Sequence, residues 1–270
     1  MNYRLNTRYD EMCLVIKVAV KQPCEVVVKV ASEDKPNIVF TDRWATVRGQ
    51  QTFYVRLPMT SENVIISVYD KKVGNLPKAQ EKNITILEVN KTPLEKRLDV
   101  VDIKNVVVAN FVDFAQRFAY NAPNLSANKT YQSDNGQFLI EYIPVIVSSK
   151  TGREMTTPAR ISRVTGRIQV AKKYFDKYTV PMRFAILCHE FSHFYVNDDI
   201  DNESEADING LLIYLGLGYP RIEGLQAFYE VFKESDSQQN LNRMKIIEKF
   251  VMDFEKNKMV LRWTKQQKKY

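Results

Sequence analysis

The sequence predicts an α+β protein in which an all-β sandwich, residues 1–98, precedes a mixed domain with a helical C-terminal part, residues 99–270. Three observations predict this division. Short runs rich in Val, Ile, Phe and Tyr, separated by Gly, Pro, Asn and Asp, dominate the first part and are typical of strands. Residues 91–98 (KTPLEKRL) are polar and suit a linker. Beyond them, apolar residues recur mainly at helical spacing.

About seven strands are expected in the N-terminal domain, which favours a sandwich. Apolar and polar residues alternate in several of the runs, as in Tyr54-Val55-Arg56-Leu57, so these strands should bury one face. No group of catalytic residue types occurs there, and we expect a docking or assembly domain. The expected strands are residues 12–20, 24–30, 37–40, 44–48, 52–57, 64–69 and 84–89.

The second domain should open with an amphipathic helix, residues 103–120, because Val107, Phe111, Phe114 and Phe118 follow helical spacing. A polar loop, strands and further helices come next. Pro181 suits the first turn of the helix that begins there. The expected elements are a loop at 121–135, strands at 138–147, 159–163 and 167–171, and helices at 181–196, 203–217, 221–232 and 241–254.

The helix after Pro181 carries His189-Glu190-Phe191-Ser192-His193, which contains both histidines of the chain. Positions i and i+4 of a helix lie on one face, so the two imidazoles can offer nitrogen atoms to one ion. Glu190 would lie beside that ion, where a carboxylate can accept a proton from a metal-bound water. The alternative interpretation is an amphipathic helix with two polar histidines on its rim. Cys188 is expected to be a small core residue, and three cysteines indicate reduced thiols.

A third ligand is expected from Asn202–Asp207, which begins a second helix. Glu203 and Asp207 are i and i+4, so one carboxylate can bind the ion while the other accepts the remaining N–H of a ligand imidazole. Glu205 points about 200° around the helix from Glu203 and is the alternative ligand. Gly210, one turn further along the same face, would let this helix approach the first closely.

These elements and motifs resemble the zincin metallopeptidases. His189–His193 matches their His-Glu-x-x-His signature, and Glu203–Asp207 is similar to the Glu-x-x-Ala-Asp segment of the gluzincin branch. The resemblance covers roughly residues 103–235. It implies a zincin-like domain that binds Zn²⁺ through His189, His193 and Glu203, with Asp207 bracing a histidine. The nine residues between His193 and Glu203 are fewer than in many gluzincins.

The resemblance also implies hydrolysis of peptide bonds in a peptide or protein substrate, with Glu190 as general base. Residues 167–171 are expected to be an edge strand that an extended peptide can join. With no third histidine in the chain, a tyrosine or arginine must stabilise the negative charge that develops on the substrate. The candidates, which the sequence does not rank, are Tyr174, Tyr214, Tyr219 and Arg221.

A structural role is the alternative hypothesis, in which the zincin fold is kept as a scaffold with or without activity. The pairing of a β-domain with this motif resembles proteins of the tail and ring modules of crAss-like bacteriophages. That resemblance implies a virion location and protein partners for residues 1–98 in a large homo- or hetero-oligomeric assembly.

Composition and charge indicate the class of protein, the partners and the cellular location to expect. With 44% hydrophobic and 26% charged residues, the chain is expected to be globular. The net charge of +7 comes from basic residues spread along the chain apart from the basic end, residues 262–270, so nucleic acid is not an expected partner. The sequence contains neither a membrane-length apolar run nor an N-terminal signal-like core. A cytoplasmic location without a membrane partner is the expectation.

Overall fold

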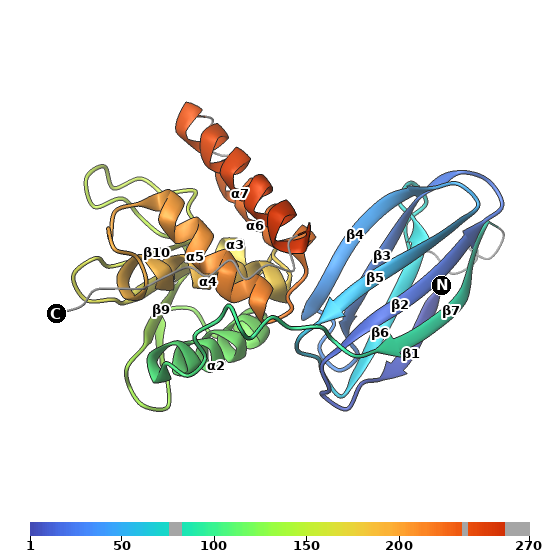
Figure 1. The fold of residues 1–270 in the computed structure, drawn as a ribbon, viewed down its shortest axis with the longest axis horizontal. Coiled ribbons are helices and arrows are strands. Elements are labelled where there is room, and N and C mark those ends of the chain that lie inside the picture. The colour runs from blue at the N-terminus through green and yellow to red at the C-terminus, as the bar shows by residue number, and fades with distance from the viewer. Residues whose placement is uncertain (76–82, 234–236, 257–270) are drawn as a thin grey trace. The chain divides into compact units, whose positions relative to one another are not determined.

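The computed structural model describes residues 1–75, 83–233 and 237–256, with side chains as far as Phe254. The chain is an α+β protein, as expected (Figure 1). It divides into two compact units. The first comprises residues 1–95, 178–181 and 218–223, and the second comprises residues 96–177, 182–217 and 224–270.

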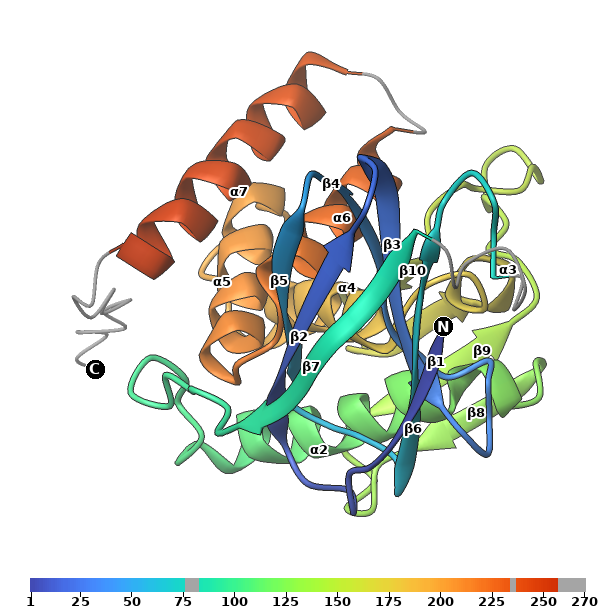
Figure 2. The same ribbon diagram turned by 90° about the vertical axis from the view of Figure 1, so that its right-hand side faces the viewer.

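The first unit is built from two antiparallel sheets with strand orders β1-β6-β3-β4 and β5-β2-β7 (Figure 2). Every second residue of β2, from Met12 to Val20, is buried, which is the pattern of a strand with one face in a core. The matching apolar positions of β3, Val26, Val28 and Val30, are fully buried. The strands are β1 (Asn2–Asn6), β2 (Met12–Val20), β3 (Cys24–Ser32), β4 (Val39–Val47), β5 (Gln50–Leu57), β6 (Asn63–Asp70) and β7 (Ile84–Thr92).

Two strands of this unit differ from the prediction. The strands expected at 37–40 and 44–48 form one strand, β4, because the polar residues between them keep their register with β3, Asp42 opposite Lys29. Strand β1 was not expected, since its side chains are mostly exposed and show no apolar alternation. Backbone pairing with β6, from Asn2 opposite Ser67 to Asn6 opposite Asn63, defines β1.

The second unit contains a four-stranded sheet of order β10-β11-β9-β8 and most of the helices. Strand β11 pairs with β9 in parallel, and the other pairs are antiparallel. The elements are α2 (Val106–Asn121), the 3-10 helix η1 (Ala122–Asn124), β8 (Lys129–Gln132), β9 (Leu139–Ile143), β10 (Ala159–Ile161), β11 (Ile168–Ala171), α3 (Lys172–Phe175), α4 (Val180–Tyr195), α5 (Glu203–Gly216), α6 (Arg221–Phe232) and α7 (Gln238–Lys256).

The order of this sheet corrects one prediction about its edge. Strand β11, within the expected edge strand 167–171, lies between β10 and β9, and the edge strands are β10 and β8. Alternation identifies strands but not their neighbours, which are set by packing at long range. Strand β8 falls within the expected loop 121–135, and β9 ends at Ile143, directly before Pro144, which lacks a backbone N–H for the sheet.

Helix α4 is fixed to α2 by aromatic stacking and by a buried arginine. Phe111 of α2 stacks on Phe191 of α4 with 3.9 Å between ring centroids. Arg183 is fully buried and donates through Nε to the Phe175 carbonyl (2.6 Å) and through a terminal nitrogen to the Ala119 carbonyl (3.0 Å). These contacts satisfy carbonyls at helix ends and hold the helix that carries the histidines in place.

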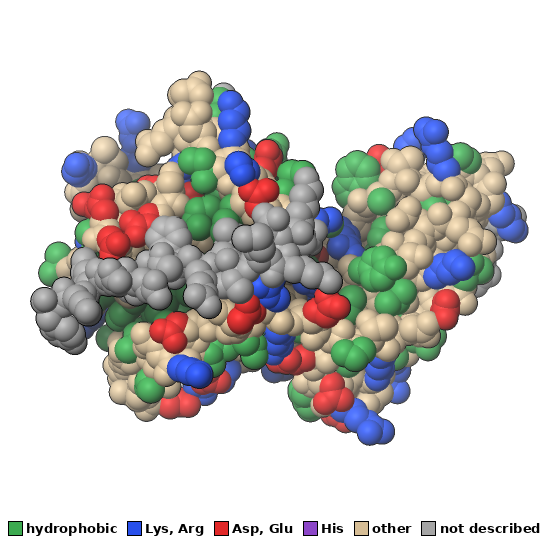
Figure 3. Space-filling model, in the orientation of Figure 1, with side chains coloured by type: hydrophobic (Ala, Val, Ile, Leu, Met, Phe, Trp, Pro, Cys, Tyr) green, Lys and Arg blue, Asp and Glu red, His purple; other side chains and the backbone are tan. Residues whose placement is uncertain are grey.

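Acidic and basic side chains are interspersed over the face that Figure 3 shows. In the described part of the chain, no helix combines the length and the apolar character that a bilayer crossing requires.

Candidate metal centre

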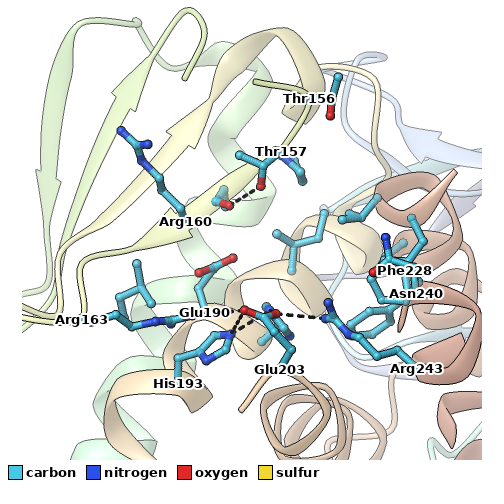
Figure 4. Close-up of a pocket in the computed structure, with 18 residues that line it drawn as sticks. Thr156, Thr157, Arg160, Arg163, Glu190, His193, Glu203, Phe228, Asn240 and Arg243 are labelled. Carbon is cyan, nitrogen blue, oxygen red and sulfur yellow. Dashed lines mark hydrogen bonds and ion pairs between the residues drawn. The ribbon is translucent and has the colours of Figure 1, made fainter. Parts of the chain in front are cut away.

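Helices α4 and α5 bring His189, His193 and Glu203 together. The two histidine Nε2 atoms are 3.2 Å apart. The Glu203 carboxylate lies 3.5 Å from His189 Nε2 through one oxygen and 3.4 Å from His193 Nε2 through the other. Figure 4 shows Glu203 facing His193, with the Glu190 carboxylate on the same side of the histidine. The three residues expected as ligands therefore converge on one point.

The hydrogen bonds of the outer nitrogen atoms orient both imidazoles. His193 Nδ1 lies 2.9 Å from the Ile200 carbonyl, which can only accept, so Nδ1 carries the proton and the lone pair is on Nε2. His189 Nδ1 lies 3.0 Å from Asp207 Oδ1, although its N–H is not well aligned with that oxygen. Two lone pairs and a carboxylate that face one point repel each other, so a proton or a metal cation is needed among them.

The distances fit a tetrahedral metal ion. Bonds of about 2.0–2.1 Å to nitrogen and oxygen place the ligands of a tetrahedral Zn²⁺ about 3.3–3.4 Å apart. The two Nε2 atoms are 3.2 Å apart, and each lies 3.4 or 3.5 Å from a different Glu203 oxygen, so the separations are close to this spacing and either oxygen can face an ion. Two imidazoles and one carboxylate also form a donor set that leaves a fourth position open for water or substrate.

The start of α5 selects Glu203 over Glu205 as the carboxylate of this cluster. Asn202 caps the helix by accepting the Glu205 N–H at 3.0 Å. The Glu205 carboxylate accepts the backbone N–H groups of Asp198 (2.9 Å) and Asp199 (3.3 Å). Glu205, the alternative ligand, is therefore held against the connecting loop, and Glu203 is free to face the histidines.

Gly210 permits the close approach of α5 and α4, as the sequence predicted. A β-carbon at this position would lie 2.8 Å from His189 N and 2.9 Å from the carbonyl carbon of Cys188. These are backbone atoms of a packed helix, which cannot move aside as the end of a flexible side chain can. The contact sets the separation between the two ligand-bearing helices.

The substitution Gly210→Ala is expected to lower the free energy of unfolding by up to about 2 kcal/mol, because an overpacking cost of about 1–3 kcal/mol exceeds the roughly 1 kcal/mol gain in helix propensity. It should also weaken metal binding by moving Glu203 away from His189. Urea unfolding and a metal titration measure the two effects. Unchanged values in both would show that the helices tolerate a methyl group here.

Arg243 of α7 completes the site and was not predicted from the sequence. It donates to both oxygens of Asp207 at 2.8 Å each, and a terminal nitrogen lies 3.1 Å from Glu203 Oε2. Its guanidinium stacks over Phe232 at 4.5 Å from the ring centroid. Burial would raise the pKa of Asp207, but Arg243 and His189 hold it below its usual range. Asp207 is thus kept ionised between an arginine and an imidazole.

Arg163, which follows β10, approaches Glu203 as well and was not predicted either. Its terminal nitrogen lies 3.3 Å from Glu203 Oε1, and its Nε lies 3.6 Å from Asp201. Figure 4 shows Arg163 and Arg243 on opposite sides of Glu203. Burial would raise the pKa of Glu203, but the two imidazoles hold it well below its usual range.

His189 should bind a proton tightly when no ion is bound. Burial would lower the pKa of His189, but the carboxylates of Asp207 and Glu203 outweigh burial and raise it to about 10. Because the pKa is raised, the resulting stabilisation of the ion-free protein is complete below pH about 6.5 and is lost as the pH rises toward 10. A metal ion must displace this proton.

Zinc binding at pH 7.5 is therefore expected to release about one proton from His189, and the affinity should rise by up to about tenfold per pH unit between pH 6.5 and 8. Titration calorimetry in buffers of different ionisation enthalpy measures the proton count. Binding without proton release would show that His189 is already neutral.

The cluster opens onto a cavity of about 360 Å³. Glu190 lines it and is only 8% exposed. Helix α6 forms an apolar wall, and β10 lies along another side. None of the four residues proposed as charge-stabilising donors (Tyr174, Tyr214, Tyr219 and Arg221) lines this cavity, and Tyr214 and Tyr219 are fully buried elsewhere. The arginines that line the cavity are Arg160, Arg163 and Arg243. The apolar residues of this wall are Ala227, Phe228, Val231 and Phe232 of α6, joined by Ile186 of α4.

No family model, curated protein or solved structure matches the chain significantly.

Proposed function

We propose that this protein is a zinc-dependent peptidase and that its second unit is a zincin-like domain. The observation that carries the proposal is the triangle of nitrogen and oxygen donors from His189, His193 and Glu203, with Glu190 beside it on the wall of one cavity. Two imidazoles, a carboxylate ligand and a second, non-ligating carboxylate are the residues that hydrolysis by an activated water requires.

A bound Zn²⁺ would supply a water molecule of lowered pKa and polarise the scissile carbonyl. Glu190 accepts a proton from the water as its oxygen bonds to the carbonyl carbon. Glu190 then returns the proton to the nitrogen as the C–N bond breaks, so the products are a carboxyl group and an amine. Ile200 and Asp207 keep the proton-bearing nitrogen atoms of the imidazoles away from this chemistry.

The open edge of β10 offers backbone groups to an extended substrate. The Ser162 N–H donates to the Arg167 carbonyl and the Ala171 N–H to the Pro158 carbonyl, both at 2.8 Å, while Arg160 lies opposite Gln169. By alternation, the N–H and C=O groups of Ala159 and Ile161 point away from β11, where the Ala159 carbonyl already accepts the Thr157 hydroxyl at 2.8 Å. Both residues line the cavity, so β10 takes the part that was expected of residues 167–171.

The test is cleavage of a mixed-sequence peptide library by the zinc-loaded full chain, followed by mass spectrometry and compared with chelator-treated protein. We expect cleavage that depends on zinc at a stoichiometry of one ion per chain. One bound zinc without cleavage would reject the peptidase and favour the scaffold alternative, in which the fold serves assembly. No bound zinc would reject both the metal site and the peptidase.

A further inference from the structure

We propose that Arg163 is a catalytic residue, which donates a hydrogen bond to the substrate carbonyl oxygen as that oxygen gains negative charge. This inference rests on the proposed peptidase function and assigns the oxyanion donor that the mechanism above leaves open. It is carried by the position of the guanidinium beside Glu203 and by a terminal nitrogen of Arg163 that is buried and has no hydrogen-bond partner.

Three other polar side chains that line the cavity have partners of their own. The Thr157 hydroxyl donates to the Ala159 carbonyl at 2.8 Å, the dashed contact near the top of Figure 4. Arg243 is bound at both oxygens of Asp207. Arg160 donates to Gln169 at 2.8 Å, and Figure 4 shows its guanidinium turned away from Glu190.

Arg163 differs from these residues because it keeps a free donor within the site. One terminal nitrogen contacts Glu203 Oε1 at 3.3 Å, and the other, Nη1, is the buried atom without a partner. Leaving a buried donor unsatisfied costs about 1–3 kcal/mol, and more for a charged group. In Figure 4 the guanidinium points inward, toward Glu203 and below the Glu190 carboxylate. Arg163 lines the cavity, so a substrate oxygen that binds against its guanidinium can accept this N–H.

The charge of the site also favours an anionic oxygen. Glu190, Glu203 and Asp207 against Arg163 and Arg243 leave one net negative charge when both imidazoles are neutral. A divalent cation changes this to one net positive charge. When Glu190 takes up the water proton, the groups around the substrate carry two net positive charges against the one negative charge on its oxygen, and the attraction is strong because the site is largely buried.

The hairpin that carries Arg163 is packed against the helix that carries the histidines. Gly166, in the turn between β10 and β11, has φ +68°, and a β-carbon there would lie 2.8 Å from the Tyr195 hydroxyl and 3.1 Å from the Phe194 ring. Both aromatic residues follow His193 on α4. Arg163 and His193 are therefore held in a fixed relation before substrate binds, as a pre-organised oxyanion donor requires.

The test compares Arg163→Met with Arg163→Lys and with Arg167→Met, a matched control on the other arm of the hairpin whose guanidinium lies near Glu141 and outside the cavity lining. Arg163→Met should lower kcat by about 100- to 1,000-fold with KM changed less than about threefold. Zinc content should stay at one per chain. Arg163→Lys should recover part of the loss, and Arg167→Met should match wild type.

A second experiment measures the binding of an inhibitor and does not require catalytic turnover. The zinc-loaded proteins are titrated with N-phosphoryl-leucyl-phenylalanine, whose tetrahedral anionic group resembles the hydrolytic transition state. Arg163→Met should bind it about 100-fold more weakly than wild type and Arg167→Met equally well. A wild type that cleaves nothing but shows this difference would reject the peptidase and retain Arg163 as the anion donor.

Two results would overturn the role of Arg163. Equal affinity of wild type and Arg163→Met for the phosphoryl dipeptide, or no binding by wild type, would show that Arg163 does not face the anion. Loss of zinc together with loss of activity in Arg163→Met would make it a positioning residue for Glu203.

Discussion

Zinc-loaded Glu190→Gln is expected to retain one zinc per chain and to lose peptide cleavage by about 100- to 10,000-fold, the usual contribution of general acid–base catalysis. Glutamine has nearly the same shape as glutamate but cannot accept the proton from water. Glu190 is not one of the three residues that form the metal triangle, so the ligands remain. The 8% exposed side chain is replaced by one of equal volume, so packing should not change.

The measurement is kcat/KM on a library-derived peptide, with zinc content measured on the same samples. Glu154→Gln is the matched control, because Glu154 lies in the same unit but pairs with Lys173 and does not line the cavity. It should retain wild-type activity. Substantial cleavage by Glu190→Gln would show that another group accepts the proton and would remove Glu190 from the mechanism.

Replacing Glu203 by alanine is expected to lower zinc affinity by more than about 100-fold, because loss of a ligand should exceed the roughly 10- to 100-fold effect of losing an outer partner. Electrostatic repulsion lowers the zinc affinity further. Arg163 and Arg243, 3.3 and 3.1 Å from the Glu203 carboxylate, would be left with uncompensated positive charge facing the ion. The variant should therefore disfavour any cation at this point.

Glu205→Ala provides the comparison, since Glu205 is the other carboxylate that the sequence offered. Its loss frees the backbone N–H groups of Asp198 and Asp199 and should loosen the loop, with zinc affinity reduced less than about tenfold. Competition against a chromophoric chelator gives both affinities. The assignment of the third ligand would be reversed if Glu205→Ala lost zinc and Glu203→Ala kept it.

Local patterns predicted the parts of the site that share one helix or one short segment. The spacing of His189 and His193, and that of Glu203 and Asp207, follows directly from the helical repeat. The close approach at Gly210 followed from its place on the same face of α5. The α+β composition and most strands were evident from the change from alternation to helical spacing.

Contacts between distant segments were not predicted. Arg243 binds Asp207 across 36 positions, and Arg163 reaches Glu203 across 40. In the sequence Arg243 belongs to a segment whose apolar stripe indicates only a packed helix, and Arg163 lies in an unremarkable hairpin. The edge position of β10 was missed for the same reason, because strand order depends on packing that no local period encodes.

Asp207 is shared between His189 of α4 and Arg243 of α7, and this sharing links the proposed metal site to the last described helix. An ion that replaces the proton at Nε2 of His189 keeps the Nδ1–H directed toward Asp207, and Asp207 in turn holds α7 through two hydrogen bonds. Such coupling is reciprocal, so a metal that favours the docked helix must itself be bound more tightly when the helix is docked. If the proposed ion binds, the stability of α7 would report metal occupancy, and the amide hydrogen exchange of α7 is expected to slow.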